Sequence, residues 1–470
     1  MGTSAEDPLT FLGHNSAEFK LQLPDCREGS SSLAMASLLL SLTVASLMTS
    51  FAAAVSNGDF NILSFNVAGL PSILNDNAVP GNKATNAGTI GTLFAKYDYD
   101  VINVQEDFAY HADIYATDDH PYRTATSGTA GIGSGLNTLS NFDWIDFTRV
   151  KWATCSDASG ADCLTPKGFT FMRVLVSEGV YVDFYNLHAD AGTEAADETA
   201  RAANLQQVAD YIDTWSIGNS VVLYGDTNSR YTRALDNITV FENQNSLTDA
   251  WVELENGGVN PTVLTLCDNP SLINTCETVD KVFYRGSKQL SLTGTYFNYE
   301  SSKFLQSNGS ILSDHNPITV NFTWTTDDSL SQSEFWGGPH GTWFNDIDSI
   351  PSSPKTSEIT FRGGSRLNSV ALTLTSGATF THGGTGGTNT SLALESSEYW
   401  TSAQLCQGQY NSETRNFYIL ATTSTGRTLS SGTATSDCST FTAPTGWQIV
   451  GYMGQDGDEI DQLAFIYAPY

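Results

Sequence analysis

Basic residues are scarce in this chain. Among 470 residues there are 21 Lys and Arg against 51 Asp and Glu, which gives a formal net charge of -30 at pH 7. This balance repels the phosphates of nucleic acids and of anionic membranes unless local patches or bound cations intervene. We therefore regard nucleic acid as a disfavoured partner, although the charge alone does not exclude it.

Charged residues of both signs are also few, at 15% of the sequence, whereas Gly, Ser and Thr are abundant. Such a composition is typical of an exported protein built largely from strands and turns. The chain is too long for a single hydrophobic core. We therefore expect at least two domains and a secreted, extracellular location.

An apolar run without charge, residues 33–54, ends in small residues. It predicts a secretory signal peptide at about 35–54, and since Met35 is a natural start, residues 1–56 are interpreted as a leader. The alternative is a single membrane anchor, which the length of the run barely permits. Its Ser, Thr and Ala content and the lack of a basic cluster after it favour cleavage.

Cysteine is used sparingly, with seven residues, of which Cys26 falls in the leader. The other six lie in close pairs, namely Cys155 with Cys163, Cys267 with Cys276, and Cys406 with Cys438. These spacings resemble no zinc site, so in an oxidising compartment they predict three local disulfides. The same route would make four glycosylation sequons usable, at Asn237, Asn308, Asn321 and Asn389.

Residues 57–325 alternate short β-rich runs with loops and two helical stretches, 87–96 and 194–215. A polar linker, 326–334, then separates this mixed α and β domain from an all-β domain at 335–470. We therefore predict a leader and two domains.

Polar side chains follow several apolar runs of the first domain at the point where each strand ends. They are Asn66, Glu106, His188, Asp226 and Asn228, and further along the chain Asp280, Asp314 and His315. Polar groups at strand ends converge on one rim of a sheet, where loops build sites. Each alone is more often a cap, a turn residue or a core histidine, so the order of the set carries the prediction.

The ordered set comprises Asn, Gln-Glu, Asn-x-His, Gly-Asp-x-Asn, Val-Asp and Ser-Asp-His, and it resembles the endonuclease/exonuclease/phosphatase superfamily over residues 59–324. That superfamily includes pancreatic-type deoxyribonucleases, secreted neutral sphingomyelinases and inositol polyphosphate phosphatases. The resemblance implies an α/β four-layer sandwich in which helices flank two packed mixed β-sheets. It also implies a metal-dependent phosphoric ester hydrolase.

The resemblance assigns roles that suit the residue types. Glu106, with Asn66 and Asp314 nearby, would bind Mg²⁺ (or Mn²⁺), which prefers oxygen ligands. Asp226 would orient or deprotonate a water, and Asn228 would donate a hydrogen bond to a phosphate oxygen.

The two histidines complete this set. His315 would be the base or an electrostatic partner at phosphorus, held by Asp280, and His188 a phosphate-contacting group or acid. The alternative for Asp280 is a strand-start residue paired with Lys281. We interpret Asp190 as a turn residue and Asp249 as a helix cap or supporting group.

The substrate class stays open at this stage. The segment Lys167-Gly168-Phe169 resembles that of secreted neutral sphingomyelinases and phosphatases more than that of deoxyribonucleases. Four aromatic residues are candidates for contact with a bilayer, and for them we favour core packing: Trp144, Trp152, Phe169 and Phe171. A phospholipid head group or a small phosphate ester is preferred over nucleic acid, and peripheral membrane contact is left open.

Residues 335–470 resemble a jacalin-type lectin domain in their glycine-rich N-terminal turn and in a Gly-x-x-x-Asp loop near the C-terminus. The resemblance implies an all-β β-prism of three antiparallel sheets that binds glycans. Gly337, Gly338, Gly457 and Asp461 would form the sugar site, since glycines let backbone amides approach closely. The alternative for Asp461 is that it only fixes its own loop.

The sequence thus predicts a secreted phosphoesterase that its lectin domain targets to glycan-bearing surfaces. Two alternatives remain. One is a secreted nuclease, and the other is a lectin whose phosphoesterase-like domain is a catalytically inactive scaffold.

Overall fold

A computed structural model describes residues 56–470 except 76, 128–132 and 161. The predicted signal peptide and Met35 lie outside the described residues. Among the described residues, no helix combines the length and the apolar character needed to cross a membrane.

The elements of the first domain run as follows: β1 (Asn57–Asn66), α1 (Lys83–Tyr97), β2 (Val101–Gln105), α2 (His111–Tyr115), β3 (Tyr122–Arg123), β4 (Asn137–Ser140), β5 (Trp144–Lys151), η1 (Asp162–Leu164), β6 (Gly168–Ser177), β7 (Val180–His188), α3 (Ala195–Trp215), β8 (Val221–Asp226), α4 (Val240–Asn245), β9 (Thr248–Asp249), α5 (Ala250–Glu255), β10 (Asp280–Arg285), β11 (Leu290–Tyr299) and β12 (Ile318–Thr326). Both predicted helices are present, as α1 and α3.

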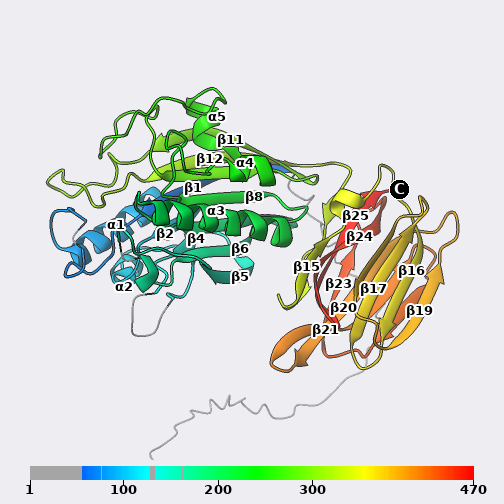
Figure 1. Cartoon of the computed structure of the whole chain (residues 1–470). Coiled ribbons are helices and arrows are strands. Elements are labelled where there is room, and N and C mark those ends of the chain that lie inside the picture. The colour runs from blue at the N-terminus through cyan, green and yellow to red at the C-terminus, as the bar shows by residue number, and fades with distance from the viewer. Residues whose placement is uncertain (1–55, 76, 128–132, 161) are drawn as a thin grey trace, which may run out of the picture. The chain divides into compact units, whose positions relative to one another are not determined.

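Two six-stranded sheets organise this domain, in the orders β11-β12-β1-β2-β4-β3 and β5-β6-β7-β8-β10-β9 (Figure 1). Each sheet is mixed, because β1 with β2 and β7 with β8 pair in parallel while their other neighbours are antiparallel. The carboxyl ends of these parallel pairs therefore define one edge of each sheet.

The layers follow from the side-chain alternation of the strands. In β1, Phe60 and Ile62 pack with Phe184 of the second sheet in one core. The intervening side chains, such as Leu63, pack against Phe94 of α1 in another core. On the second sheet, α3 packs over the outer face in a third core. The resulting order of helix, sheet, sheet and helix confirms the predicted four-layer sandwich.

The elements of the second domain are β13 (Ser331–Gln332), β14 (Trp336–Gly337), β15 (Thr342–Asn345), η2 (Ile347–Ser349), β16 (Thr356–Gly363), β17 (Leu367–Leu374), β18 (Thr379–Gly383), β19 (Thr388–Ala393), β20 (Trp400–Tyr410), β21 (Glu413–Thr423), β22 (Thr428–Gly432), β23 (Asp437–Thr442), β24 (Trp447–Asp456) and β25 (Ile460–Pro469). They form three antiparallel sheets around one core that contains Trp400, which confirms the predicted β-prism. β13 lies in the predicted linker and pairs with β25, while the domain boundaries stay predictions.

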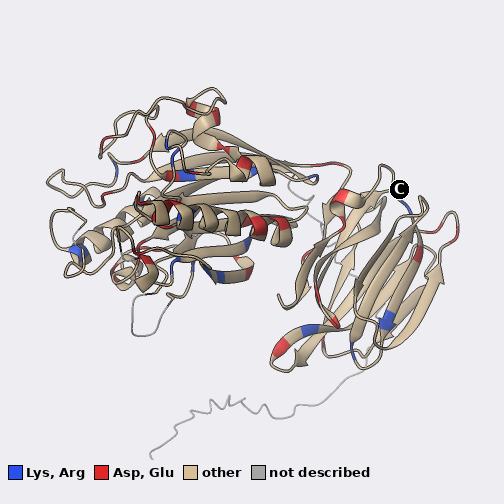
Figure 2. Ribbon diagram, viewed as in Figure 1, with Lys and Arg blue, Asp and Glu red and all other residues tan. Residues whose placement is uncertain are grey.

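The three predicted cysteine pairs are bonded: Cys155–Cys163, Cys267–Cys276 and Cys406–Cys438. Of the four sequons, Asn308, Asn321 and Asn389 are exposed, whereas Asn237 is half-buried. Figure 2 shows acidic residues along α3 and few basic residues on the ribbon as a whole. The scarcity of positive charge is therefore visible over both domains.

Candidate active site

Three neighbouring strands bring carboxylates and an imidazole to one edge of the second sheet. His188 at the end of β7 lies in register with Asp226 at the end of β8, and Asp226 lies in register with Asp280 at the start of β10. The local sequence explains the close spacing of β7 and β8. A Cβ atom at Gly225 would lie 2.3 Å from the carbonyl oxygen of Leu187, so only glycine fits beside Asp226.

His315 lies between the two carboxylates. Its Nδ1 atom is 2.9 Å from Oδ2 of Asp280, and its Nε2 atom is 3.7 Å from Oδ2 of Asp226. Lys281, the partner that the alternative assigned to Asp280, pairs instead with Glu277 at 3.4 Å. Asp280 is therefore placed to fix the ring of His315.

The electrostatics of this group follow from burial and charge. Burial alone lowers the pKa of His315, but the carboxylates of Asp280 and Asp226 outweigh it and hold that pKa well above its usual value. Burial raises the pKa of Asp226 to about 6, against the opposing effect of His315. At neutral pH the arrangement therefore favours a protonated imidazole beside the ionised carboxylate of Asp226.

His188 behaves in the opposite way. Burial lowers its pKa well below the usual value, and the positive charges of Lys167 and His315 act in the same direction. The Nζ atom of Lys167 lies 3.1 Å from Nε2 of His188 and also forms an ion pair with Asp162. An ammonium group can only donate, so Nε2 of a neutral His188 is the acceptor. Lys167 thus places a positive charge beside the site.

The first sheet contributes an amide and two further carboxylates. Asn66, at the end of β1, donates from Nδ2 to Glu106 at 3.2 Å and to Asp226 at 3.1 Å, and so connects the two sheets. Glu106 has a φ of 55°, a left-handed conformation that is uncommon outside glycine. Asn77 donates to Oδ2 of Asp314 at 3.2 Å, and its Nδ2 atom is 3.5 Å from Oε2 of Glu106.

One amide nitrogen thus contacts both carboxylates that the sequence assigned to a metal. A position that attracts a hydrogen-bond donor between two carboxylates also suits a hard divalent cation, and oxygen is the ligand type that Mg²⁺ prefers. Asp226, Asp280 and His315 also approach one another within 4.8 Å. In that second group, Nδ1 of His315 contacts Asp280 at 2.9 Å, which is the geometry of a carboxylate and imidazole pair.

Gln105 and Asn186 link the two sheets next to the site. Both belong to the sequence motifs, but the sequence assigned them no role. Gln105 precedes Glu106, and its amide donates to Oδ1 of Asn186 at 2.8 Å. Asn186 in turn donates to the carbonyl of Val104 at 3.0 Å. Both amides are buried, so this contact fixes the position of β2 against β7.

The remaining predicted residues have identifiable places. The Asn228 side chain donates to the carbonyl of Ala189 at 3.1 Å, and its backbone amide donates to Asp226. Asp249 is the N-cap of α5, and buried Asp190 accepts a hydrogen bond from the backbone of Ser156.

The four aromatic candidates for bilayer contact do not protrude. Trp152, Phe169 and Phe171 are buried, and Trp144 is half-buried. The preference for core packing is therefore confirmed for the three buried residues.

The predicted sugar-site residues also come together. Gly338 donates to the carbonyl of Asp461 at 3.1 Å, and a Cβ atom at Gly337, whose φ is 106°, would lie 2.0 Å from that same oxygen. Gly457 lies beside the carboxylate of Asp461. The sequence reasoning missed Arg415, whose Nη1 atom is 2.7 Å from Oδ1 of Asp461.

Comparison with family models agrees with both halves of the structure. Residues 74–259 match the Endonuclease/Exonuclease/phosphatase family 2, and residues 333–466 match the jacalin-like lectin domain. The chain therefore carries an endonuclease/exonuclease/phosphatase domain followed by a jacalin-like lectin domain.

Among curated proteins, sphingomyelinases of Mycobacterium bovis and Mycobacterium tuberculosis are 37% identical to this chain over 278 residues, 58% of this chain and 54% of theirs. The chain thus spans about half the length of these relatives. Among solved structures, sphingomyelinase C from Streptomyces griseocarneus is 17% identical with a TM-score of 0.39 and covers 56% of this chain and 99% of its own. A mannose-binding jacalin-related lectin from Ananas comosus is 20% identical with a TM-score of 0.27 and covers 30% and 99%.

Proposed function

We propose that this protein is a secreted, divalent-metal-dependent phosphodiesterase that hydrolyses the head group of a phospholipid, with sphingomyelin as the first candidate substrate. The observation that carries the proposal is the convergence of Asp226, Asp280 and His315 beside the pair Glu106 and Asp314. The 37% identity to sphingomyelinases supports the choice of substrate.

The roles of the residues follow from their charge states. Asp226 accepts the proton of the attacking water, and its pKa of about 6 leaves it ionised at neutral pH. His315, protonated and held by Asp280, stabilises the negative charge that grows on the phosphoryl group. Lys167, which contacts neutral His188, would add a positive charge close to the bound phosphate, and His188 would assist as a phosphate-contacting group or acid.

Asn228 keeps one amide hydrogen for a phosphate oxygen while the other donates to Ala189. Glu106, Asp314 and Asn66 would hold Mg²⁺ or Mn²⁺. When bound, the ion supplies Lewis-acid neutralisation of the phosphoryl and leaving-group oxygens.

The lectin domain would concentrate the enzyme at glycan-bearing surfaces, an effect of local concentration rather than of catalysis. Secretion is part of the proposal, supported by the apolar run at 33–54 and by the three disulfides.

The test uses the full chain and a chromogenic phosphodiester. Glu106→Gln and Asp314→Asn should each lower kcat/KM about 100-fold or more, and a chelator should abolish the wild-type turnover. Glu358→Gln in the lectin domain is the matched control and should leave the rate unchanged. Chelator-insensitive turnover retained in both site variants would overturn the metal mechanism.

A substrate panel separates the remaining possibilities. Wild-type protein is assayed on sphingomyelin, inositol phosphates and plasmid DNA. Hydrolysis of sphingomyelin supports the proposal, whereas DNA nicking that falls with salt identifies a nuclease. Silence across the panel identifies a lectin with an inactive scaffold.

A further inference from the structure

Two loops beside the candidate active site present aliphatic side chains to solvent. Ile73 and Leu74, in the loop that follows β1, are 94% and 61% exposed. Leu272 and Ile273, in the loop closed by the Cys267–Cys276 disulfide, are 85% and 56% exposed. We call these four residues the aliphatic rim. Single exposed aliphatic residues are ordinary, but a group of them carried by the loops of one site indicates a binding surface.

The first loop is fastened to the site from within. Asn77, at its end, contacts the carboxylates of Glu106 and Asp314. The buried ammonium group of Lys83 donates to the carbonyls of Ala68 at 2.7 Å and Leu70 at 2.9 Å. These contacts hold the ends of the loop against the protein, whereas its tip, residues 72–75, is exposed to water and includes Ile73 and Leu74.

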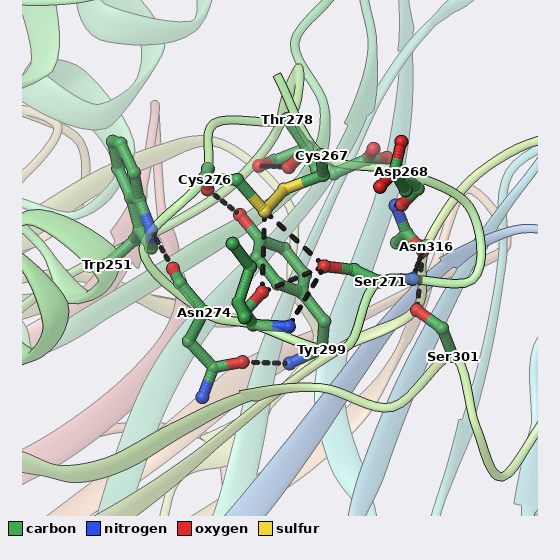
Figure 3. Close-up of a disulfide and its surroundings, with 12 residues drawn as sticks. Trp251, Cys267, Asp268, Ser271, Asn274, Cys276, Thr278, Tyr299, Ser301 and Asn316 are labelled. Atoms are coloured by element: carbon green, nitrogen blue, oxygen red, sulfur yellow. Dashed lines mark hydrogen bonds between the residues drawn. A yellow bond between two sulfur atoms is a disulfide. The ribbon is translucent and has the colours of Figure 1, made fainter. Parts of the chain in front are cut away.

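The second loop is fastened to the segment that carries Asp314 and His315. Asn316, the next residue, donates to the carbonyl of Asp268 at 3.0 Å and accepts from the backbone of Ser271 at 3.1 Å (Figure 3). Asn269 donates to the carbonyl of Ser313 at 2.9 Å. These contacts anchor the loop to the segment of the site, whereas Leu272 and Ile273 are exposed, as are Asp268 and Thr275.

The charge of these loops indicates which kind of lipid surface they can contact. Residues 67–77 and 267–276 contain no Lys or Arg and two acidic residues, Asp76 and Asp268. Anionic lipid surfaces attract basic clusters, and the net charge of -30 opposes such attraction. An aliphatic surface without positive charge fits an electrically neutral lipid interface.

We infer that the aliphatic rim docks the catalytic domain on a zwitterionic lipid bilayer. This inference rests on the proposed hydrolysis of a phospholipid head group. Ile73, Leu74, Leu272 and Ile273 enter the boundary between head groups and acyl chains, where they leave water. Because both loops are attached to the residues of the site, docking brings the site to the depth of the phosphodiesters.

The test measures binding and turnover separately with the full chain. The probe is glycan-free phosphatidylcholine vesicles in a sedimentation assay, so the lectin domain does not contribute. Replacing all four rim residues by Gln should lower the bound fraction at least tenfold. It should lower hydrolysis of vesicle-embedded substrate by a similar factor and leave hydrolysis of the soluble chromogenic diester unchanged. Ile217→Gln is the matched control, since Ile217 is also exposed but precedes β8 and so lies at the opposite end of the sheet from Asp226.

Three outcomes would overturn the inference. They are equal vesicle binding by the fourfold Gln variant, wild-type binding to anionic vesicles alone, and self-association through the rim without binding to vesicles. Failure of the proposed function looks different. In that case wild type binds phosphatidylcholine vesicles and loses binding in the fourfold variant, yet hydrolyses neither the soluble nor the vesicle-embedded substrate.

Discussion

The Nδ1 atom of His315 lies 2.9 Å from Oδ2 of Asp280, although 35 residues separate them in the chain. Asp280 opens β10, which pairs with β8, whereas His315 lies in the loop that leads into β12 of the other sheet. The contact therefore forms only when the two sheets pack, and it ties the charge of the imidazole to the completed fold.

Asp280→Asn should change the protonation of His315 while leaving its ring in place. Asn keeps the shape of the side chain but removes the carboxylate that raises the pKa of His315. We expect kcat/KM to fall about 100-fold at neutral pH. The alkaline limb of the pH profile should also move to lower pH, because the protonated imidazole is then lost earlier. An unchanged profile for this variant, with Asp249→Asn as the control, would contradict the role of Asp280.

The fall of kcat/KM at acidic pH should follow the protonation of Asp226. Burial raises the pKa of this carboxyl to about 6, and only the ionised form can accept a proton from water. We expect kcat/KM of the wild type to rise tenfold for each pH unit below about 6 and then to level off. Asp226→Asn should abolish this limb together with nearly all turnover. A limb that persists in the residual activity of the variant would assign the titration to another group.

The sequence predicted the fold well because its signals were local. The β-rich runs and the helices at 87–96 and 194–215 carry their own periodicity, and the structure places these helices at Lys83–Tyr97 and Ala195–Trp215. Site residues at strand ends were also accessible to sequence reasoning, since a polar side chain after an apolar strand marks the edge of a sheet.

The roles of residues in loops could not be predicted in this way, because loops have no periodic pattern. Asn77 reaches Asp314 across 237 residues, and no pattern around it predicts that contact. For the proposed lipid-facing surface, the aromatic candidates in the sequence include Trp152 and Phe169, which are core residues, as the preference for core packing predicted. The exposed side chains are aliphatic, and nothing in a loop sequence tells an exposed Leu272 from a buried one.

The buried contact between Gln105 and Asn186 should matter for stability as well as for activity. Asn186→Ala removes the 2.8 Å acceptor of the buried Gln105 amide, whose remaining contacts, with Asn103 and Ser64, are 3.4 and 3.5 Å long. The loss of a buried hydrogen-bond partner costs about 1–3 kcal/mol. We expect that loss in the free energy of unfolding, measured with urea, together with a lower kcat. Thr293→Ala, at an exposed position on β11, should change the free energy of unfolding by less than about 0.5 kcal/mol. Equal stability of the two variants would show that the amide contact adds nothing to the packing of the sheets.

Asp461→Asn should separate glycan binding from catalysis. The carboxylate of Asp461 lies beside the backbone of Gly457 and pairs with Arg415. In the predicted sugar site its ionised form would accept hydrogen bonds from sugar hydroxyls. Burial raises the pKa of Asp461 to about 7, although Arg415 opposes this, so glycan binding by the wild type should weaken as the pH falls through about 7.

In glycan-array or calorimetric measurements we expect the variant to bind at least tenfold more weakly at pH 8 and to lose the pH dependence, while turnover of the soluble diester stays at the wild-type rate. Wild-type glycan affinity in the variant would mean that Asp461 only fixes its own loop. The lectin domain would then select its ligand through other groups.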